Sequence, residues 1–252
     1  MYVKGKTYLV TGASKGFGLA ITKKLLDAGA NVAMLARNND VLQEAVAGFA
    51  TDRVAGYPCD ISNKQQVGDV FASVKEHFGS FNGLINNAGL ARPNKVENLI
   101  EEEVMLQVNT NFVGTVLCCQ AAIPLLRGQE NPRIVNISSA SAWHYNEMLH
   151  LSIYAATKAA VERFTRDLRL ELQDDGIGVT CLRPGAAGTD FASGWDTDAI
   201  VAGYEAWKRV GSHMDTGMSV EHVAEAVLQT LSYPAGVAVD LLEVRPNIAV
   251  PK

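Results

Sequence analysis

Short β-rich runs alternate with longer helical segments along nearly the whole chain, and this alternation restricts the fold more than any other feature. The β-rich runs are short and apolar, and each following segment repeats its apolar residues with a helical period. Such alternation is typical of parallel strands joined by crossover helices that cover both faces of a sheet. The sequence therefore predicts an α/β fold of Rossmann-like type, a doubly wound parallel sheet in three α/β/α layers.

One segment interrupts the alternation. The strands are expected near residues 7–12, 31–36, 54–60, 83–89, 133–139 and 178–185, and the helices near 18–29, 41–50, 64–79, 102–126, 152–176 and 220–231. After Thr189, residues 190–218 contain helical pieces but no strand. Ligands of doubly wound folds bind beyond the carboxyl ends of the strands, where this insertion begins. We therefore expect a substrate lid at about 190–218 within a single domain that spans residues 1–252.

Composition excludes several classes of function. The 27 acidic and 22 basic residues give a net charge of -5, which disfavours nucleic acid and anionic membranes as partners. The first apolar segment begins at Thr7 and runs into a glycine turn, and no apolar run approaches the ~18 residues that a bilayer requires. The cysteines have neither metal-binding nor disulfide spacing. We expect a soluble cytoplasmic protein without a metal site.

A glycine-rich turn joins the first expected strand to the first helix. The sequence TGASKGFG, residues 11–18, places glycines at Gly12, Gly16 and Gly18. Because they lack side chains, these glycines allow a tight turn and let the backbone approach a pyrophosphate at the helix N-terminus. Many α/β proteins need such a turn for packing, and its spacing differs from the G-x-G-x-x-G fingerprint. The turn alone therefore does not establish a nucleotide site.

Tyr154 and Lys158 lie four residues apart in SIYAATKAAVERF, a stretch with the pattern of a helix. Residues at this spacing project from the same helix face, so a phenol and an ammonium share one site. A nearby cation favours the phenolate and lowers the phenol pKa from its usual value near ~10. The pair can therefore exchange a proton with a substrate. A surface lysine beside a half-buried tyrosine would give the same spacing.

Together with NNAG at residues 86–89, the glycine turn and the Tyr154–Lys158 pair resemble the motifs of the short-chain dehydrogenase/reductase family, T-G-x-x-x-G-x-G, N-N-A-G and Y-x-x-x-K. The resemblance extends from Thr7 to about Leu231. It implies an oxidoreductase that transfers hydride between a nicotinamide cofactor and a carbonyl or secondary alcohol. The cofactor-binding residues that it implies are Gly12, Ser14, Lys15, Gly16, Phe17, Gly18, Arg37, Asp60, Ile61, Asn87, Ala88, Gly89, Tyr154, Lys158, Pro184, Gly185 and Thr189.

The resemblance also implies roles for the catalytic side chains. Tyr154 would protonate the ketone oxygen as a general acid, or act as the base in the oxidative direction. Lys158 would lower the pKa of Tyr154 and hold the hydroxyls of the nicotinamide ribose. Ser139 would donate a hydrogen bond to the substrate oxygen and stabilise its developing charge.

Asn111 matches the active-site asparagine of the family. It lies three residues before Gly114, as the family pattern requires, whereas Asn109 does not. Its implied role is to anchor a water that connects Lys158 to solvent. An asparagine that bridges a helix kink is the structural alternative, and it is compatible with that role.

The identity of the active-site serine is open between two positions. Ser141 lies thirteen residues before Tyr154, which is the usual separation in the family, and Ser139 lies fifteen before it. We favour Ser139 because it ends the expected strand, as the family serine does, and because the loop at 143–151 can account for two extra residues. Ser138 would then be a strand residue that points away.

The end of the second expected strand indicates the cofactor. A member of this fold that binds NAD usually has an acidic residue there to bind the ribose hydroxyls, and the residue in this chain is Ala36. Arg37 follows, and Lys15 lies in the glycine turn, so two cations can converge on a 2′-phosphate. We therefore expect NADP(H). Both cations would also fit as solvated surface charges.

Aromatic and cationic residues gather in the loop after the expected serine and in the lid. They are Trp143, His144, Tyr145, His150, Phe191, Trp195, Tyr204, Trp207, Lys208, Arg209 and His213. They could enclose a small carbonyl compound, including one with a carboxylate, or pack the lid onto the body or onto another subunit. The C-terminal sequence VAVDLLEVRPNI resembles that of members acting on small hydroxy acids and related alcohols.

Two other classes of function share this fold. One is a nucleotide-binding sensor or scaffold without turnover, and the other is a dehydratase or epimerase. In every case the partner would be a small molecule. The helices that carry Asn111 and Tyr154 have enough apolar surface to pack beyond their own sheet, so we expect a homo-oligomer, a tetramer or a dimer.

Overall fold

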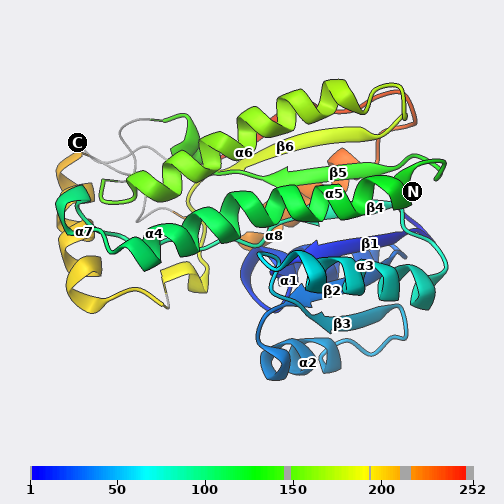
Figure 1. Ribbon diagram of the computed structural model, residues 1–252, viewed down its shortest axis with the longest axis horizontal. Helices are drawn as coiled ribbons and strands as arrows, with labels where there is room; N and C mark the ends of the chain where they lie inside the picture. The colour runs from blue at the N-terminus through cyan, green and yellow to red at the C-terminus, as the bar shows by residue number, and fades with distance from the viewer. Residues whose placement is uncertain (1, 145–148, 193, 211–216, 248–252) are drawn as a thin grey trace.

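The strands form one parallel sheet in the order β3-β2-β1-β4-β5-β6-β7 (Figure 1). This computed structural model describes residues 2–144, 149–192, 194–210 and 217–247. Its strands are β1 (Thr7–Thr11), β2 (Asn31–Ala36), β3 (Val54–Pro58), β4 (Gly83–Asn86), β5 (Arg133–Ile137), β6 (Gly178–Pro184) and β7 (Leu241–Val244). The strand order reverses between β1 and β4, which creates the switch point where ligands of such sheets bind. The predicted doubly wound parallel fold is confirmed.

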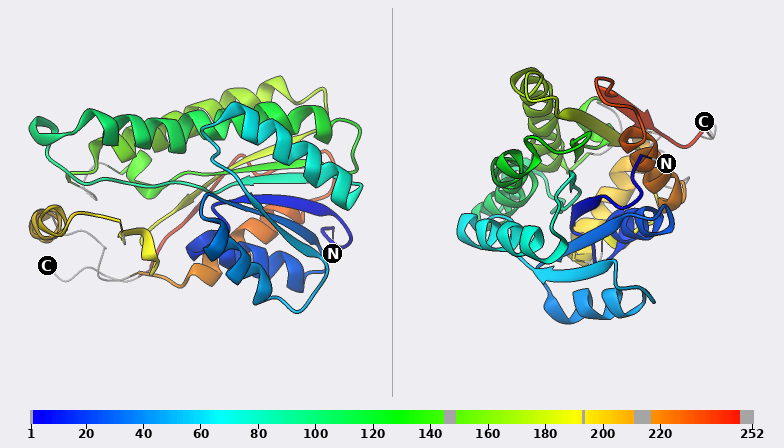
Figure 2. Two further views of the ribbon diagram at one scale, coloured as in Figure 1. Left: turned by 60° about the horizontal axis from the view of Figure 1, so that its bottom comes forward. Right: turned by 90° about the vertical axis from the view of Figure 1, so that its right-hand side faces the viewer.

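Helices cover both faces of the sheet (Figure 2). They are α1 (Gly16–Asp27), α2 (Asn39–Ala47), α3 (Lys64–Phe78), α4 (Glu101–Val108), α5 (Gly114–Leu126), α6 (Ser152–Glu171), α7 (Thr197–Val210) and α8 (Val220–Leu231). Side chains of α1, α2 and α8 form the core on one face, and those of α3, α5 and α6 form the core on the other. Successive strand residues point to opposite faces, so Tyr8 and Val10 enter the first core and Leu9 enters the second.

The edge strand β7 was not among the strands expected from the sequence. It pairs in parallel with β6 from Cys181↔Leu241 to Pro184↔Val244. Its residues are exposed or half-buried, so it lacks the buried apolar pattern that marks the central strands. In the interrupted segment, the short 3-10 helix η4 (Asp190–Ala192) and α7 match the expected helical pieces. α7 lies beyond the carboxyl ends of the strands, at the left of Figure 1.

The helix expected near 102–126 is continuous but contains a π-helical turn. The turn, η2 (Asn109–Val113), separates α4 from α5. The run Glu101–Leu126 has the length and composition of a membrane-crossing helix, and 39% of its most apolar window is buried. This differs from the expectation that no segment approaches bilayer length. Core helices of soluble proteins meet the same criteria, so the run is weak support for a membrane span.

Candidate active site

Thr11 joins the glycine turn to the NNAG segment at the switch point. Its hydroxyl oxygen accepts hydrogen bonds from the backbone N–H groups of Asn87 and Ala88, each at 3.0 Å. In return, the Asn87 amide nitrogen donates to the backbone oxygens of Thr11 at 2.9 Å and Gly12 at 3.2 Å. Two motifs that lie 75 residues apart in the sequence are thus hydrogen-bonded to each other. Sequence reasoning gave Thr11 no role of its own, although it is the first residue of the turn motif.

The glycine turn packs too closely for side chains at two of its positions. A Cβ at Gly12 would lie 2.8 Å from Ala88 Cα, and a Cβ at Gly18 would overlap the carbonyl oxygen of Gly12. Gly12 and Gly16 have φ values of 63° and 55°, a region that favours glycine. No side chain caps the N-terminus of α1 at Lys15, so the N–H groups of the first turn are available to a phosphate.

The chain beyond β6 approaches the glycine turn from the other side. Pro184 ends this strand, and the Gly185 N–H donates to the Val244 carbonyl at 2.8 Å. Thr189 lies against Gly16, where a Cβ would be 3.7 Å from Thr189 Cβ. The structure therefore brings Thr189, but not Pro184 or Gly185, against the glycine turn.

Two other residues of the glycine turn differ in their surroundings. Ser14 is half-exposed on the turn. Phe17 is partly buried and packs against the core beneath α1. Ser14 thus lies on the open side of the turn, whereas Phe17 anchors it.

Arg37 and Lys15 follow the ends of adjacent strands. The Ala13 N–H donates to the Leu35 carbonyl at 3.0 Å, which ties the glycine turn to the end of β2. Ala36 is half-buried where an acid would bind ribose hydroxyls, and Arg37 and Lys15 are both exposed. Both cations therefore lie beyond the carboxyl ends of adjacent strands, as the cofactor hypothesis requires.

Asp60 and Ile61 lie between β3 and α3. One carboxylate oxygen of Asp60 accepts from the Ser62 N–H at 2.9 Å and from its hydroxyl at 2.7 Å, and the Asp60 N–H donates to Gln66. Ile61 is buried against Gly114, where a Cβ would lie 2.7 Å from its side chain. Asp60 therefore stands half-exposed in a fixed turn, and Ile61 supports it from the core.

Ser139 is the serine that contacts Tyr154. The neighbouring Ser139 side chain acts to lower the pKa of the Tyr154 phenol. The Ser139 oxygen also accepts from the Ser141 N–H at 3.2 Å and from the Ser141 hydroxyl at 2.9 Å. Ser138 points elsewhere and donates to a Glu162 carboxylate oxygen at 2.8 Å. In this arrangement Ser141 supports Ser139, and no contact of Ser141 with Tyr154 is seen among the described side chains.

Tyr154 and Lys158 are both buried near the start of α6. The Lys158 ammonium donates to the Ile137 carbonyl at 2.9 Å and lies 5.9 Å from the centre of the Tyr154 ring. Burial raises the pKa of Tyr154 to about 12, and the Ser139 side chain lowers it in part. The expectation that Lys158 lowers this pKa is therefore not met. Burial of the phenol outweighs a cation that lies over the ring and donates to a carbonyl.

The buried ammonium predicts that stability depends on pH. Burial lowers the pKa of Lys158 from 10.5 to about 8, so the native state holds this proton less tightly than the unfolded chain does. The destabilisation is fully present below pH 8 and is relieved as pH rises toward 10.5. Between about pH 7 and 10 the free energy of unfolding should rise by about 2 kcal/mol relative to Lys158→Met. Urea denaturation measures this, with Lys23→Met as an exposed control. A difference independent of pH would contradict it.

Asn111 lies in the π-helical turn and clamps the chain that leaves NNAG. Its side-chain oxygen accepts from the Leu90 N–H at 2.8 Å, and its nitrogen donates to the Leu90 carbonyl at 2.8 Å and to the Thr157 hydroxyl at 3.0 Å. A Cβ at Gly89 would lie 3.2 Å from the Lys158 nitrogen and 3.4 Å from the Asn111 oxygen. A side chain at this position would therefore crowd both the ammonium and the Asn111 amide. These bonds tie the helix to the segment after NNAG and to α6, and both the kink-bridging alternative and the water-anchoring role stay predictions.

Aromatic side chains of the interrupted segment pack onto Tyr154. The Phe191 ring lies 5.3 Å from the Tyr154 ring, Trp195 lies 5.8 Å from Phe191, and Trp207 lies 6.1 Å from Trp195, measured between ring centres. The Trp207 indole donates to the Leu149 carbonyl at 2.7 Å. These aromatics therefore attach the segment to the body and also form one side of the space beside Tyr154.

The remaining aromatic and cationic candidates have other neighbours. Lys208 lies 4.3 Å over the exposed Tyr204 ring, and His144 lies 2.7 Å from Glu243. Trp143 is exposed, with the Arg183 guanidinium 5.5 Å from its ring centre. Tyr145 and His213 lie outside the described residues.

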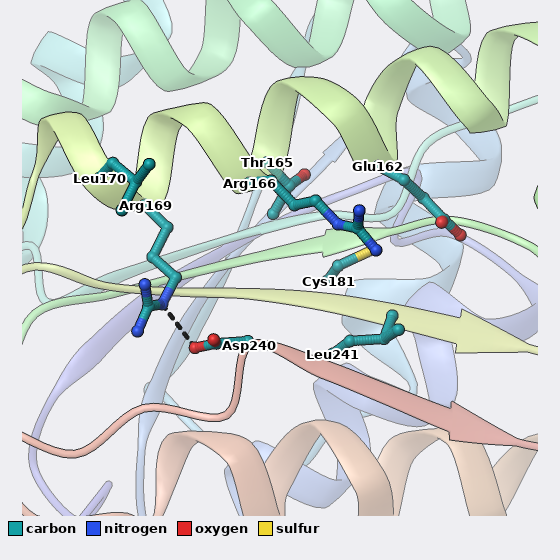
Figure 3. Close-up of a pocket in the computed structure, with 8 residues that line it drawn as sticks. All are labelled: Glu162, Thr165, Arg166, Arg169, Leu170, Cys181, Asp240 and Leu241. Atoms are coloured by element: carbon teal, nitrogen blue, oxygen red, sulfur yellow. Dashed lines mark ion pairs between the residues drawn. The ribbon is translucent and has the colours of Figure 1, made fainter.

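A separate groove of about 390 Å³ lies between α6, β6 and β7 (Figure 3). Its lining residues are Glu162, Thr165, Arg166, Arg169, Leu170, Cys181, Asp240 and Leu241. Glu162, the lining residue of α6 nearest to Tyr154, is eight residues away, about 12 Å along a helix. None of the residues predicted from the motifs lines this groove, so we place the candidate site at the switch point.

Comparisons with known proteins agree with this geometry. The family model described as short chain dehydrogenase matches residues 6–199. An uncharacterised oxidoreductase of Staphylococcus aureus strain N315 is 34% identical over 96% of this chain and 97% of its own length. A closed serine dehydrogenase complexed with NADP+ has a TM-score of 0.82 at 28% identity, over 94% of both chains. A 3-ketoacyl-(acyl-carrier-protein) reductase from Brucella melitensis, complexed with NADH, has a TM-score of 0.84 at 27% identity and covers 97% of this chain and 98% of its own.

Proposed function

The chain belongs to the short-chain dehydrogenase family, and from this premise we propose that it is an NADP(H)-dependent oxidoreductase acting on a carbonyl or secondary alcohol. The observation that carries the proposal is the buried Tyr154 phenol, whose pKa is lowered in part by the neighbouring Ser139 side chain and which shares a helix face with Lys158. These three residues and the glycine turn all lie near the carboxyl ends of the parallel strands.

The residues at the switch point fit a dinucleotide. The glycine turn leaves no room for side chains at Gly12 and Gly18, the Lys15 side chain does not cap the N-terminus of α1, and Gly89 avoids crowding the Lys158 ammonium. We infer that the pyrophosphate binds at the glycine turn, that Asp60 and Ile61 contact the adenine end, and that Thr189 contacts the nicotinamide end. When bound, the cofactor supplies or accepts the hydride. Nicotinamide cofactors in the related structures support this assignment.

The side chains around Tyr154 favour reduction. A phenol with a raised pKa is protonated at neutral pH and can donate its proton to a carbonyl oxygen as negative charge develops there. Ser139 would hydrogen-bond the same oxygen and stabilise that charge. Lys158 would bind the ribose hydroxyls, and Asn111 would anchor the water that returns a proton to the site. Residues 190–218 would act as a lid, since their aromatic rings already pack on Tyr154.

Preference for NADPH over NADH is assigned to Arg37 and Lys15. Arg37→Asp should raise the Michaelis constant for NADPH by at least about tenfold and improve the relative use of NADH, because it replaces a phosphate-binding cation with a carboxylate. Steady-state kinetics with both cofactors measures this effect, and Arg127→Asp at the far end of α5 is the control. A wild type with higher catalytic efficiency for NADH would show that the assignment of this pocket is wrong.

Net consumption of NADPH separates this proposal from the other classes. A panel of ketones and 3-oxo acids should produce a loss of absorbance at about 340 nm, the reduced-nicotinamide band. A sensor or scaffold would bind the cofactor without this loss, and a dehydratase or epimerase would return the cofactor unchanged. The grouping of the half-buried Ser139 with the buried Tyr154 and Lys158 favours turnover.

We also infer that the protein is a homo-oligomer, a dimer or a tetramer. The apolar run Glu101–Leu126 leaves most of its most apolar window unburied within one chain, which suits a contact with a second copy. Sedimentation at micromolar concentration would measure the state. A cytoplasmic location stays a prediction.

A further inference from the structure

Arg92 lies next in the chain to the buried cluster that contains Tyr154. It follows Ala91, which is fully buried in the same cluster as Tyr154. Its backbone is held firmly, because the Arg92 N–H donates to the Gln107 side-chain oxygen at 3.1 Å. The neighbouring Leu90 is clamped by Asn111 at 2.8 Å on both sides of its peptide. The position of this arginine is therefore set by the same helix that carries Asn111.

The Arg92 guanidinium retains hydrogen-bonding capacity. It has five N–H donors. Within the described part of the chain, one nitrogen donates to the Ala91 carbonyl at 2.9 Å, and Nε lies 3.7 Å from a Glu103 oxygen. Glu103 lies in the first turn of α4, which favours its negative charge, and a separation of 3.7 Å makes the pair a weak one. The side chain is 24% exposed, so an anion can reach it with little competition from water.

Trp195 carries a buried hydrogen-bond donor one residue after Gly194, which contacts Arg92. Its indole nitrogen is buried and has no hydrogen-bond partner among the described residues. A buried donor without a partner costs free energy, so a bound molecule that accepts this hydrogen bond is favoured. The preceding residue, Gly194, lies against Arg92: a Cβ there would be 3.4 Å from both terminal guanidinium nitrogens. The segment that carries the orphan donor therefore contacts the arginine.

We propose that the substrate carries a carboxylate, bound by the Arg92 guanidinium and the Trp195 indole N–H. This inference rests on the proposed function, because it places the anion next to the proton donor Tyr154. Phe191 lies between Trp195 and Tyr154, with ring-centre distances of 5.8 and 5.3 Å. The Phe191 and Trp195 rings connect the proposed anion site with Tyr154, so the carbon chain of an oxo acid or hydroxy acid would pack along these rings.

Binding of matched neutral and anionic ligands tests the subsite without turnover. Isothermal titration calorimetry with butanoate and butanamide, in the presence and absence of NADP+, should show at least tenfold tighter binding of butanoate. Arg92→Met keeps most of the side-chain volume and should abolish this preference, and Arg92→Lys should restore part of it. Trp195→Phe keeps an aromatic ring but removes the indole N–H, and it should reduce the preference for butanoate over butanamide severalfold. Arg127→Met at an exposed ion pair should have no effect.

Kinetics with 3-oxobutanoate and its methyl ester completes the test. Arg92→Met should raise the Michaelis constant for the acid at least tenfold and leave that for the ester within about threefold. Equal binding of butanoate and butanamide to the wild type, or an unchanged preference in Arg92→Met, would overturn the subsite. If neutral ketones are reduced while butanoate does not bind, the proposed function stands and the subsite falls. If Arg92 governs butanoate binding but no carbonyl compound oxidises NADPH, the subsite stands and the proposed function falls.

Discussion

Tyr154→Phe is expected to lower turnover by about a hundredfold or more, while cofactor affinity changes by no more than a few-fold. The substitution removes only the hydroxyl group, which would donate the proton and whose pKa the Ser139 side chain lowers in part. The ring remains among Ala91, Leu151 and Phe191, so the fold and the aromatic cluster should be preserved. Turnover is measured by NADPH consumption, and affinity by titration of the cofactor fluorescence.

Tyr57→Phe is the matched control for this substitution. Tyr57 lies on β3, and its buried hydroxyl has no partner among the described residues, so removing it should leave turnover unchanged. Near-normal turnover in a folded Tyr154→Phe protein would show that another group supplies the proton. The mechanism proposed here would then be wrong.

Ser139→Ala should also reduce turnover by about a hundredfold, whereas Ser141→Ala should reduce it only a few-fold. Ser139 lies next to Tyr154 and would stabilise the charge on the substrate oxygen, and the loss of one preorganised donor has an effect of this size. Ser141 donates to Ser139 at 2.9 Å, so its loss removes support for the active serine and not the serine itself.

The relative loss of turnover in the two variants decides which serine is the active-site residue. A larger loss in Ser141→Ala than in Ser139→Ala would show that the thirteen-residue separation from Tyr154 was the better guide. Ser138→Ala serves as a further comparison. Because Ser138 bonds Glu162, we expect it to change thermal stability more than turnover.

Several expectations from the sequence describe the structure closely because they rest on local patterns. Strand and helix periods predicted the parallel sheet, and the glycine spacing predicted the tight turn before α1. Tyr154 and Lys158 share a helix face because four residues make slightly more than one turn. The edge strand β7 was not predicted, because an exposed strand lacks the pattern of buried apolar residues that marks the central strands.

Properties that depend on distant neighbours could not be obtained in this way. The choice between Ser139 and Ser141 depends on which side chain lies next to Tyr154, whereas in the sequence the usual spacing pointed to Ser141 and the end of the strand pointed to Ser139. The pKa of Tyr154 rises because the body of the protein buries the phenol, an effect that the nearby lysine in the sequence did not reveal. Asn111 was chosen from its spacing, but its partners Leu90 and Thr157 became visible only in the fold.

The family and the layer architecture could be read from the sequence, because helical and strand periods and motif spacing are properties of a chain segment. The same patterns indicated which residues lie near the strand ends. The contacts between individual side chains depend on the tertiary structure. It placed Gly194 against Arg92, more than one hundred residues away in the chain, and left the neighbouring Trp195 indole without a partner. Such contacts arise from the packing of separate segments around one core, and no local pattern in either segment encodes them.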